Sequence, residues 1–217
     1  MNYTLDYFID ENIRLYQNPK DFRFNTDTKL LAKFIRLKKN ERILDIGTNN
    51  GVLLVYLDCF NVKELVGVEV MKESVDVARI NQKHFIRHTS KIIHSPIQDY
   101  KDDLFDVIIS NPPYFKLSAN HTIEHMDARQ LSRMEENLTL EELIQNVARL
   151  IKSYGRFYMV HRPNRLNEII NLLHQYNFNI RHIQFAYDSR NNVVKSVLVE
   201  AIKDSNCDMA VDAPIYI

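Results

Sequence analysis

The chain has 217 residues, of which 45% are hydrophobic and 26% charged, a composition typical of a globular domain with a sizeable core. Its 28 basic and 28 acidic residues give a net charge of zero, so a nucleic-acid partner would have to bind a local basic patch and could not be attracted by an overall positive charge. No apolar run reaches the roughly 18 residues of a membrane span, and no secretory signal opens the chain. We therefore expect a cytoplasmic protein without a membrane partner.

Two cysteines are too few for a disulfide framework. We expect Cys59 to be buried and Cys207 to lie in the C-terminal tail, both as free thiols. The oligomeric state is left open, with a monomer as the working expectation.

The first 26 residues are polar and aromatic without a clear hydrophobic period, and we expect an N-terminal extension that acts as a lid over a ligand. Asn25, Thr26 or Asp27 can each cap a helix, which is expected over residues 28–36 with one apolar face. The alternative, a helix that only packs on a sheet, stays open.

A strand over residues 42–46 leads into the turn Gly47-Thr48-Asn49-Asn50-Gly51, which opens a helix. Such a turn presents backbone N–H groups at a helix N-terminus. Gly47 permits close approach of a ligand, and Gly51 permits the helix to pack against the strand. Asn49 stands where a glycine is usual in glycine-rich nucleotide turns, and asparagine tolerates a left-handed backbone better than most residues.

A second strand over residues 64–70 ends near Glu69, eighteen positions after Gly51. An acidic residue at about this spacing suits the two ribose hydroxyls of a bound nucleoside. The alternative is a surface glutamate at a strand end. His84 and His88 are four residues apart on the following helix, but no third ligand stands nearby, so we expect no metal site.

The stretch from Asp106 to Tyr114 reads Asp-Val-Ile-Ile-Ser-Asn-Pro-Pro-Tyr. A short apolar strand ends at Asn111, because Pro112 and Pro113 cannot donate to a sheet ladder. The amide of Asn111 and the ring of Tyr114 are therefore held at the carboxyl end of a strand, where they suit a flat substrate that carries an NH2 group. The alternative is a tight loop with an asparagine cap and two structural prolines.

The remaining elements follow the same alternation of helix and strand. Residues 115–136 form a long polar stretch that we expect to face the substrate, and Thr139 with Glu142 forms a capping box. The other expected elements are a helix over 74–85, a strand over 91–94, a helix from Thr139 to Lys152 that Gly155 ends, a strand over 156–161, a helix from Asn164 to Tyr176, strands over 179–187 and 193–201, and a loose tail.

One stretch is strongly basic in an otherwise neutral chain. Between residues 149 and 195, eight cations stand against Glu168 and Asp188 alone; they are Arg149, Lys152, Arg156, Arg162, Arg165, Arg181, Arg190 and Lys195. Some of these cations can simply face solvent. The more specific alternative is that they form a patch that contacts the phosphates of a nucleic acid.

These elements predict an α/β fold, a doubly wound, mostly parallel seven-stranded sheet with an antiparallel C-terminal hairpin. The expected division is an extension over residues 1–26, the main domain over 27–203 and a tail over 204–217.

Ligands bind such a sheet outside the carboxyl ends of its strands, where the strand order reverses. Asp45, Gly47, Glu69 and Asn111 all fall at strand ends, so we expect them to meet in one crevice.

Residues 22–203 resemble the class I S-adenosylmethionine (SAM) methyltransferases. The Asn-Pro-Pro-Tyr stretch resembles the (Asn/Asp/Ser)-Pro-Pro-(Tyr/Phe) motif of amino methyltransferases. More narrowly, the chain is similar to the bacterial tRNA(Val) adenine-37 N6-methyltransferase family. That similarity is carried by Phe24-Asn25-Thr26-Asp27 with Leu30-Leu31-Ala32, Asp45 to Gly51, Asn111 to Phe115, Ala128-Arg129 with Leu131, and Lys195 to Ala201.

The resemblance implies SAM as cofactor, tRNA as partner and no metal. It implies Asn111, Pro112 and Tyr114 as catalytic residues. The implied cofactor-binding residues are Thr26, Asp27, Asp45, Gly47, Asn49, Gly51, Glu69, Val70, Ile97 and Asn111. The implied substrate-binding residues are Pro113, Tyr114, Phe115, Arg129, Arg162, Arg165 and Arg190. The backbone of Ile97 and the side chain of Asp99 remain alternatives for the contact to the adenine of SAM.

The same four-residue motif serves other amine substrates. DNA adenine, guanine N2 of rRNA and protein glutamine therefore stay open as substrates, and so does a non-catalytic RNA-binding module of the same fold.

Overall fold

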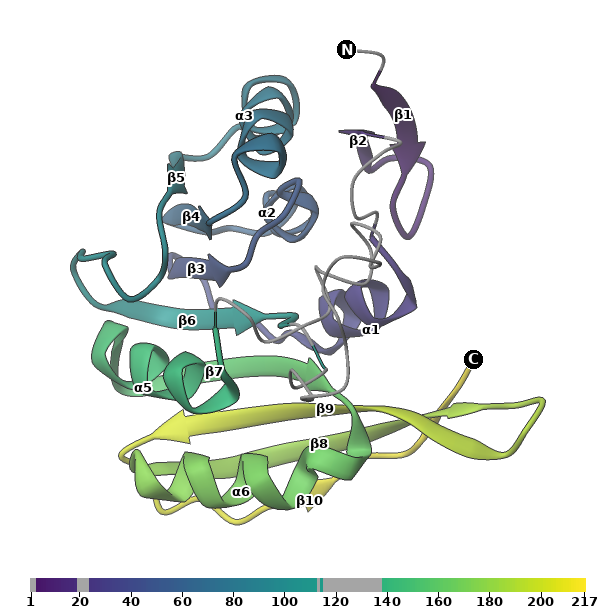
Figure 1. Ribbon diagram of the computed structural model, residues 1–217, viewed down its shortest axis with the longest axis vertical. Helices are drawn as coiled ribbons and strands as arrows, with labels where there is room; N and C mark the ends of the chain where they lie inside the picture. The colour runs from purple at the N-terminus through teal and green to yellow at the C-terminus, as the bar shows by residue number, and fades with distance from the viewer. Residues whose placement is uncertain (1–2, 19–23, 113, 115–137) are drawn as a thin grey trace, which may run out of the picture.

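The computed structural model describes residues 3–18, 24–112, 114 and 138–217. Its core is one nine-stranded sheet, in which eight strands follow the order β10-β8-β9-β7-β6-β3-β4-β5 (Figure 1). The ninth strand, β11, also pairs with β8. The strands are β3 (Arg42–Ile46), β4 (Glu64–Glu69), β5 (Ser90–His94), β6 (Phe105–Ser110), β7 (Ile151–His161), β8 (Phe178–Asp188), β9 (Val193–Lys203), β10 (Ala210–Val211) and β11 (Ile215–Tyr216). The seven expected strands are all present, and two short ones extend the sheet.

Strands β3 to β7 pair in parallel, and β9 runs antiparallel to both β7 and β8. The expected doubly wound sheet with an antiparallel C-terminal hairpin is therefore confirmed. The chain order reverses between β3 and β6, which places the ligand crevice outside the carboxyl ends of these two strands.

Helices cover both faces of the sheet. They are α1 (Thr26–Phe34), α2 (Val52–Leu57), α3 (Lys72–Phe85), α5 (Leu140–Leu150) and α6 (Leu166–Gln175), with the 3-10 turn η2 (Pro163–Arg165). Helices α1, α2 and α3 contribute to one buried apolar cluster, and α5 and α6 to another. Side chains alternate along a strand, so Ile43 packs in the first cluster and Leu44 in the second.

Two helix starts follow caps that the sequence offered, whereas the helix expected from Asn164 begins only at Leu166, because Pro163–Arg165 form the 3-10 turn η2. Of the three candidate caps, Asn25 caps α1, because its side chain accepts from the backbone N–H of Thr28 at 3.0 Å; the helix therefore spans Thr26–Phe34 instead of the expected 28–36. Thr139 and Glu142 form the expected capping box at the start of α5.

The end of α5 differs from the prediction. The helix stops at Leu150 and β7 begins at once, whereas the sequence suggested a helix to Lys152 and a strand from residue 156. The pairing with β6 skips between Ile151 and Arg156, so the intervening residues form a bulge. Gly155 lies in this bulge, where a Cβ would meet the Ile151 side chain at 2.6 Å; it does not end the helix.

The N-terminal extension contains a hairpin that the sequence did not reveal, formed by β1 (Thr4–Tyr7) and β2 (Arg14–Gln17). Asn81 of α3 is fully buried and holds it, accepting from the N–H of Tyr16 at 2.7 Å and donating to the Tyr16 carbonyl at 2.9 Å. The same amide donates to the carbonyl of Asn50 at 2.8 Å. The hairpin is thus tied to the turn after β3.

The expectation of a loose tail is wrong for residues 210–216. Strands β10 and β11 both pair in parallel with β8, and Asp212 between them binds Arg36 at 2.8 Å and His182 at 2.9 Å. The expected burial of Cys59 is also wrong, because it follows the end of α2 and is exposed. None of the helices in the described ranges has the length and hydrophobicity that crossing a membrane requires.

Candidate active site

The turn after β3 has the backbone that a close ligand approach needs. Gly47, Asn49 and Gly51 all have positive φ, of 72°, 51° and 79°. Asn49 therefore adopts the left-handed conformation expected of it. No atom lies within 4 Å of the place where a Cβ on Gly47 would stand, so the turn is open there. A Cβ on Gly51 would meet Ala78 of α3 at an ordinary 3.6 Å, so it is backbone conformation, not helix–strand packing, that favours glycine.

Glu69, at the end of β4, is held by backbone donors. Its carboxylate accepts from the N–H groups of Asn49, Val70 and Met71, each at 2.9 Å. The side chain is buried, and these bonds hold it in place beside the turn. A carboxylate has about four acceptor positions, so it retains capacity for a ligand hydroxyl.

Asp45 lies in β3, one residue before its end, and is 1% exposed. Its two carboxylate oxygens have no hydrogen-bond partner among the residues that the structure describes. Burial raises the pKa of Asp45 to about 7, the charge of Glu69 adds to this shift, and the nearby Thr48 hydroxyl opposes it. An unsatisfied buried carboxyl is costly, so this site favours a ligand that brings a cation or a hydrogen-bond donor.

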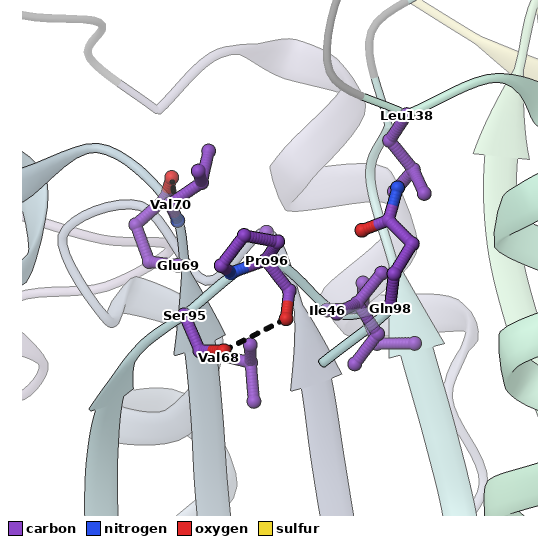
Figure 2. A pocket seen from close by; sticks show the side chains of 10 residues that line it. Ile46, Val68, Glu69, Val70, Ser95, Pro96, Gln98 and Leu138 are labelled. Carbon is purple, nitrogen blue, oxygen red and sulfur yellow. Dashed lines mark hydrogen bonds between the residues drawn. The ribbon is translucent and has the colours of Figure 1, made fainter. Parts of the chain in front are cut away.

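A pocket opens beside these residues at the carboxyl edge of the sheet (Figure 2). Figure 2 shows Glu69 and Val70 on one side, Ile46, Gln98 and Leu138 on the other, and Pro96 between them. The full lining is Ile46, Gly47, Val68, Glu69, Val70, Ser95, Pro96, Ile97, Gln98 and Leu138. Of the two alternatives left open by the sequence, Ile97 is buried in this wall, whereas Asp99 is exposed and not part of the lining.

Asn111 follows β6, the strand next to β3, and its amide is oriented by neighbours. The Nδ2 group donates to Thr28 Oγ1 of α1 at 3.1 Å, which directs Oδ1 the other way. The preceding Ser110 hydroxyl donates to the Ile46 carbonyl at 2.9 Å and ties the end of β6 to the end of β3. Because Ile46 also lines the pocket, the amide and the pocket share one edge of the sheet.

Tyr114 lies beside this amide and is only 7% exposed. Its hydroxyl lies 2.5 Å from Asn111 Oδ1 and 3.0 Å from Asp27 Oδ2, and it shares its single proton between these two acceptors. The guanidinium carbon of Arg162 stands 4.3 Å from the centre of the Tyr114 ring. His161 contacts the same ring edge to face, with the centroids 5.3 Å apart.

Asp27 lies on this side of the crevice. Its buried carboxylate accepts from the Ser196 hydroxyl of β9 and forms an ion pair with Arg162 Nη2 at 3.3 Å. It thus joins α1, β9 and Tyr114. Thr26, the other α1 residue expected to bind cofactor, is exposed at the first turn of the helix.

His161 ends β7 and is fully buried. Its Nδ1 accepts from the N–H of Arg162 at 2.8 Å, and its Nε2 has no partner in the described part of the chain. Burial and the charges of Arg165 and Arg162 lower the pKa of His161 to about 4, so the ring is neutral at physiological pH.

The eight cations of the basic stretch do not all line a surface. Arg156 is buried in a pair with Glu41 at 2.5 Å, and Arg165 is buried in a pair with Glu168 at 2.8 Å. Arg162 reaches the site, and Arg190 is exposed at the tip of the β8–β9 hairpin. The acidic partner Glu41 comes from far along the chain, which a local charge count cannot detect.

Three of the expected site residues, Pro113, Phe115 and Arg129, lie outside the described residues. The long stretch over 115–136 lies outside them too. Pro112 is buried directly after Asn111. In the described ranges, no three His, Cys, Asp or Glu side chains gather as a metal-binding group.

Among the side chains around Asn111, Tyr114 and Asp27, sequence reasoning missed three: Thr28, His161 and Ser196. Thr28 had a signal, because it is the third helical residue after the Asn25 cap. Ser196 stands in the Lys195–Ala201 stretch that carried part of the resemblance. His161 had none, since a lone histidine at a strand end is usually structural.

The fold and the crevice together define a class I methyltransferase. A solved structure of a predicted O-methyltransferase from Agrobacterium tumefaciens has the same fold, with a TM-score of 0.67 at 19% identity over 86% of this chain and 85% of its own. The sequence profile described as the methyltransferase small domain matches residues 21–184, and the chain belongs to that family. A solved Listeria monocytogenes structure titled a putative class I S-adenosylmethionine-dependent methyltransferase shares the fold, with a TM-score of 0.60 at 20% identity over 86% of this chain and 61% of its own.

Curated relatives carry a more specific name. A tRNA1(Val) (adenine(37)-N6)-methyltransferase of Tolumonas auensis is 30% identical over 157 residues, which are 70% of this chain and 65% of the relative. The protein of the same name from Pedobacter heparinus is 28% identical over 172 residues, 78% of this chain and 72% of its own. The match thus covers less than two thirds of the Tolumonas protein.

Proposed function

We propose that this protein transfers the methyl group of SAM to the exocyclic N6 of an adenine in tRNA, with adenine 37 of tRNA(Val) as the specific candidate. One observation carries the proposal. The oriented amide oxygen of Asn111 lies at the same sheet edge as the pocket lined by Glu69 and Gly47. The names of the two relatives support adenine 37 of tRNA(Val) as the target.

The residues present suit the cofactor. The unpartnered carboxyl of Asp45 would take its ammonium group, and Glu69 would accept from its ribose hydroxyls. The open turn at Gly47 leaves room for a ligand, and Val70 and the backbone of Ile97 would flank the adenine. Asn49 and Gly51 would act by holding the turn in its left-handed conformation. When bound, SAM supplies an electrophilic methyl group on a sulfonium.

The chain's own contribution to the reaction is alignment. The N6 amine of adenine is a weak nucleophile, because its lone pair is delocalised into the ring. The Asn111 Oδ1 atom and the Pro112 carbonyl would each accept one N–H bond and direct the lone pair at the methyl carbon. Transfer would form a C–N bond at N6 in exchange for the donor's C–S bond, and the displaced N6 proton would leave to solvent.

Tyr114 would stack on the adenine after the base has turned out of its loop. Such stacking contributes about 1–3 kcal/mol per base. Turning out a base costs least in single-stranded RNA, which suits an anticodon loop. Exposed Arg190 on the hairpin tip would contact phosphate, whereas Arg165, buried with Glu168, would act only by supporting η2.

The deciding experiment supplies methyl-labelled SAM with total tRNA, rRNA, DNA and cell protein in parallel, and then digests the labelled product. We expect N6-methyladenosine from tRNA, enriched in tRNA(Val). Asn111→Ala should bind SAM as the wild type does in calorimetry and lose at least about 100-fold in transfer. If the label appeared in guanine N2, DNA adenine or glutamine instead, the proposal of a tRNA substrate would be wrong. If no arm were labelled, the proposal of a methyltransferase activity would be wrong.

A further inference from the structure

The ring that is proposed to stack on the substrate already carries a flat cation. The guanidinium carbon of Arg162 lies 4.3 Å from the centre of the Tyr114 ring, a distance at which a planar group covers an aromatic face. Tyr114 is also only 7% exposed. An incoming base therefore needs part of the contact surface that Arg162 now holds.

Arg162 is held in place by three polar contacts. Its Nη1 group donates to the Lys195 carbonyl at 2.8 Å and to the Ser196 hydroxyl at 3.2 Å. Its Nη2 group pairs with Asp27 at 3.3 Å. These contacts fix the guanidinium over the ring in the protein without substrate.

Of the described side chains in contact with Tyr114, Arg162 is the one that can move away into solvent. Its side chain is 32% exposed, whereas the side chain of Asp27 is 8% exposed and His161 is fully buried. Asp27 keeps the hydrogen bonds from Ser196 and Tyr114 when the ion pair opens, so its buried charge remains compensated.

We propose that Arg162 occupies the stacking place of the base on Tyr114, and that the entering base displaces it onto a backbone phosphate of the RNA. This inference rests on the proposed function. A cation–aromatic contact and a base–aromatic stack are of similar strength, so the exchange is close to balanced. The new charge-assisted bond to phosphate then favours a base that arrives on a nucleic-acid strand over a free nucleoside.

The test compares wild type with Arg162→Gln, each saturated with the demethylated cofactor so that no turnover occurs. Two probes are titrated: adenosine, which has no phosphate, and the anticodon stem-loop of tRNA(Val). We expect the variant to bind adenosine at least as tightly as the wild type and the stem-loop about 10-fold more weakly. The plot of log affinity against log salt should flatten by about 0.7, the value for one lost phosphate contact to a single strand.

The matched control is Arg181→Gln, because Arg181 is exposed on the amino half of β8, away from the carboxyl edge of the sheet. It should bind both probes as the wild type does. Equal weakening of both probes by Arg162→Gln, or an unchanged salt slope, overturns the proposal while the wild type still methylates tRNA. A wild type that methylates no RNA at all overturns the proposed function first, and this inference with it.

Discussion

The hydroxyl of Tyr114 lies 2.5 Å from Oδ1 of Asn111, on the same oxygen that is proposed to accept an N–H bond from the substrate. Without substrate, the chain thus supplies its own donor to the amide. The Nδ2 group of Asn111 donates to Thr28, so the amide cannot turn Oδ1 away from the hydroxyl without breaking that bond. Oδ1 has two lone pairs, so a substrate amine would either share this oxygen with the phenol hydroxyl or displace it, and this predicts separate roles for the Tyr114 ring and its hydroxyl.

Tyr114→Phe keeps the ring and removes the competing donor, so we expect kcat/KM within about 10-fold of wild type, since a hydrogen bond contributes about 1 kcal/mol net. Tyr114→Ala removes the stack of about 1–3 kcal/mol and should lose roughly 5- to 150-fold. Steady-state methylation of the identified substrate measures both. A phenylalanine variant as poor as the alanine variant would show that the hydroxyl, not the ring, is what the reaction uses.

Asp45 predicts a pH dependence of cofactor affinity. Burial raises the pKa of its carboxyl to about 7, so much of it is protonated at neutral pH in the free protein. If the ionised form pairs with the ammonium of SAM, affinity should rise roughly 10-fold between pH 6 and pH 7.5 and then level off. Calorimetry at several pH values measures this, and Asp45→Asn should remove the rise.

The same carboxyl affects stability with the opposite sign. Between its unfolded pKa of about 4 and its folded pKa of about 7, the folded protein binds more protons, so this group's contribution to stability falls as pH rises. Asp45→Asn should therefore unfold at a higher temperature than wild type at pH 8, although it binds SAM more weakly. A variant that is less stable at pH 8 would contradict the burial argument.

Glu69→Gln tests the proposed ribose contact. The amide keeps the size of the side chain but loses the charge that three backbone N–H groups now share. Hydrogen bonds to charged groups contribute about 1.5–3 kcal/mol, so SAM affinity should fall about 10- to 150-fold. Cofactor affinity within twofold of wild type would refute the contact.

Arg156 is expected to act on stability alone. It is buried against Glu41, with Nη2 to oxygen distances of 2.5 and 2.6 Å. Arg156→Met leaves the buried Glu41 carboxylate without its cation, with only the Lys38 N–H as donor among the described residues, and should cost about 3–5 kcal/mol in denaturant unfolding. The double variant Arg156→Met with Glu41→Leu should recover much of this loss. If either variant altered the salt dependence of RNA binding, Arg156 would contact phosphate after all, and its role would not be confined to stability.

The local elements could be predicted from local chemistry. Thr139 is a polar cap that precedes an apolar helical period, and α5 begins where it predicts; for α1 the sequence offered three caps, of which Asn25 is the one used. The left-handed backbone of Asn49 was expected from its residue type and position. The four-residue strands β1 and β2 were missed, because so short a strand carries too few residues to show a period.

By itself, the sequence determined the alternation of helix and strand, the glycine turn and the rigid prolyl corner after β6, because each depends on residues close together in the chain. Only the tertiary structure decided which side chains meet at that corner. Thr28 is 83 residues from Asn111, and Ser196 is 169 residues from Asp27. Such contacts depend on which strands pair and in what register, and those choices depend on packing across the whole sheet rather than on any local pattern.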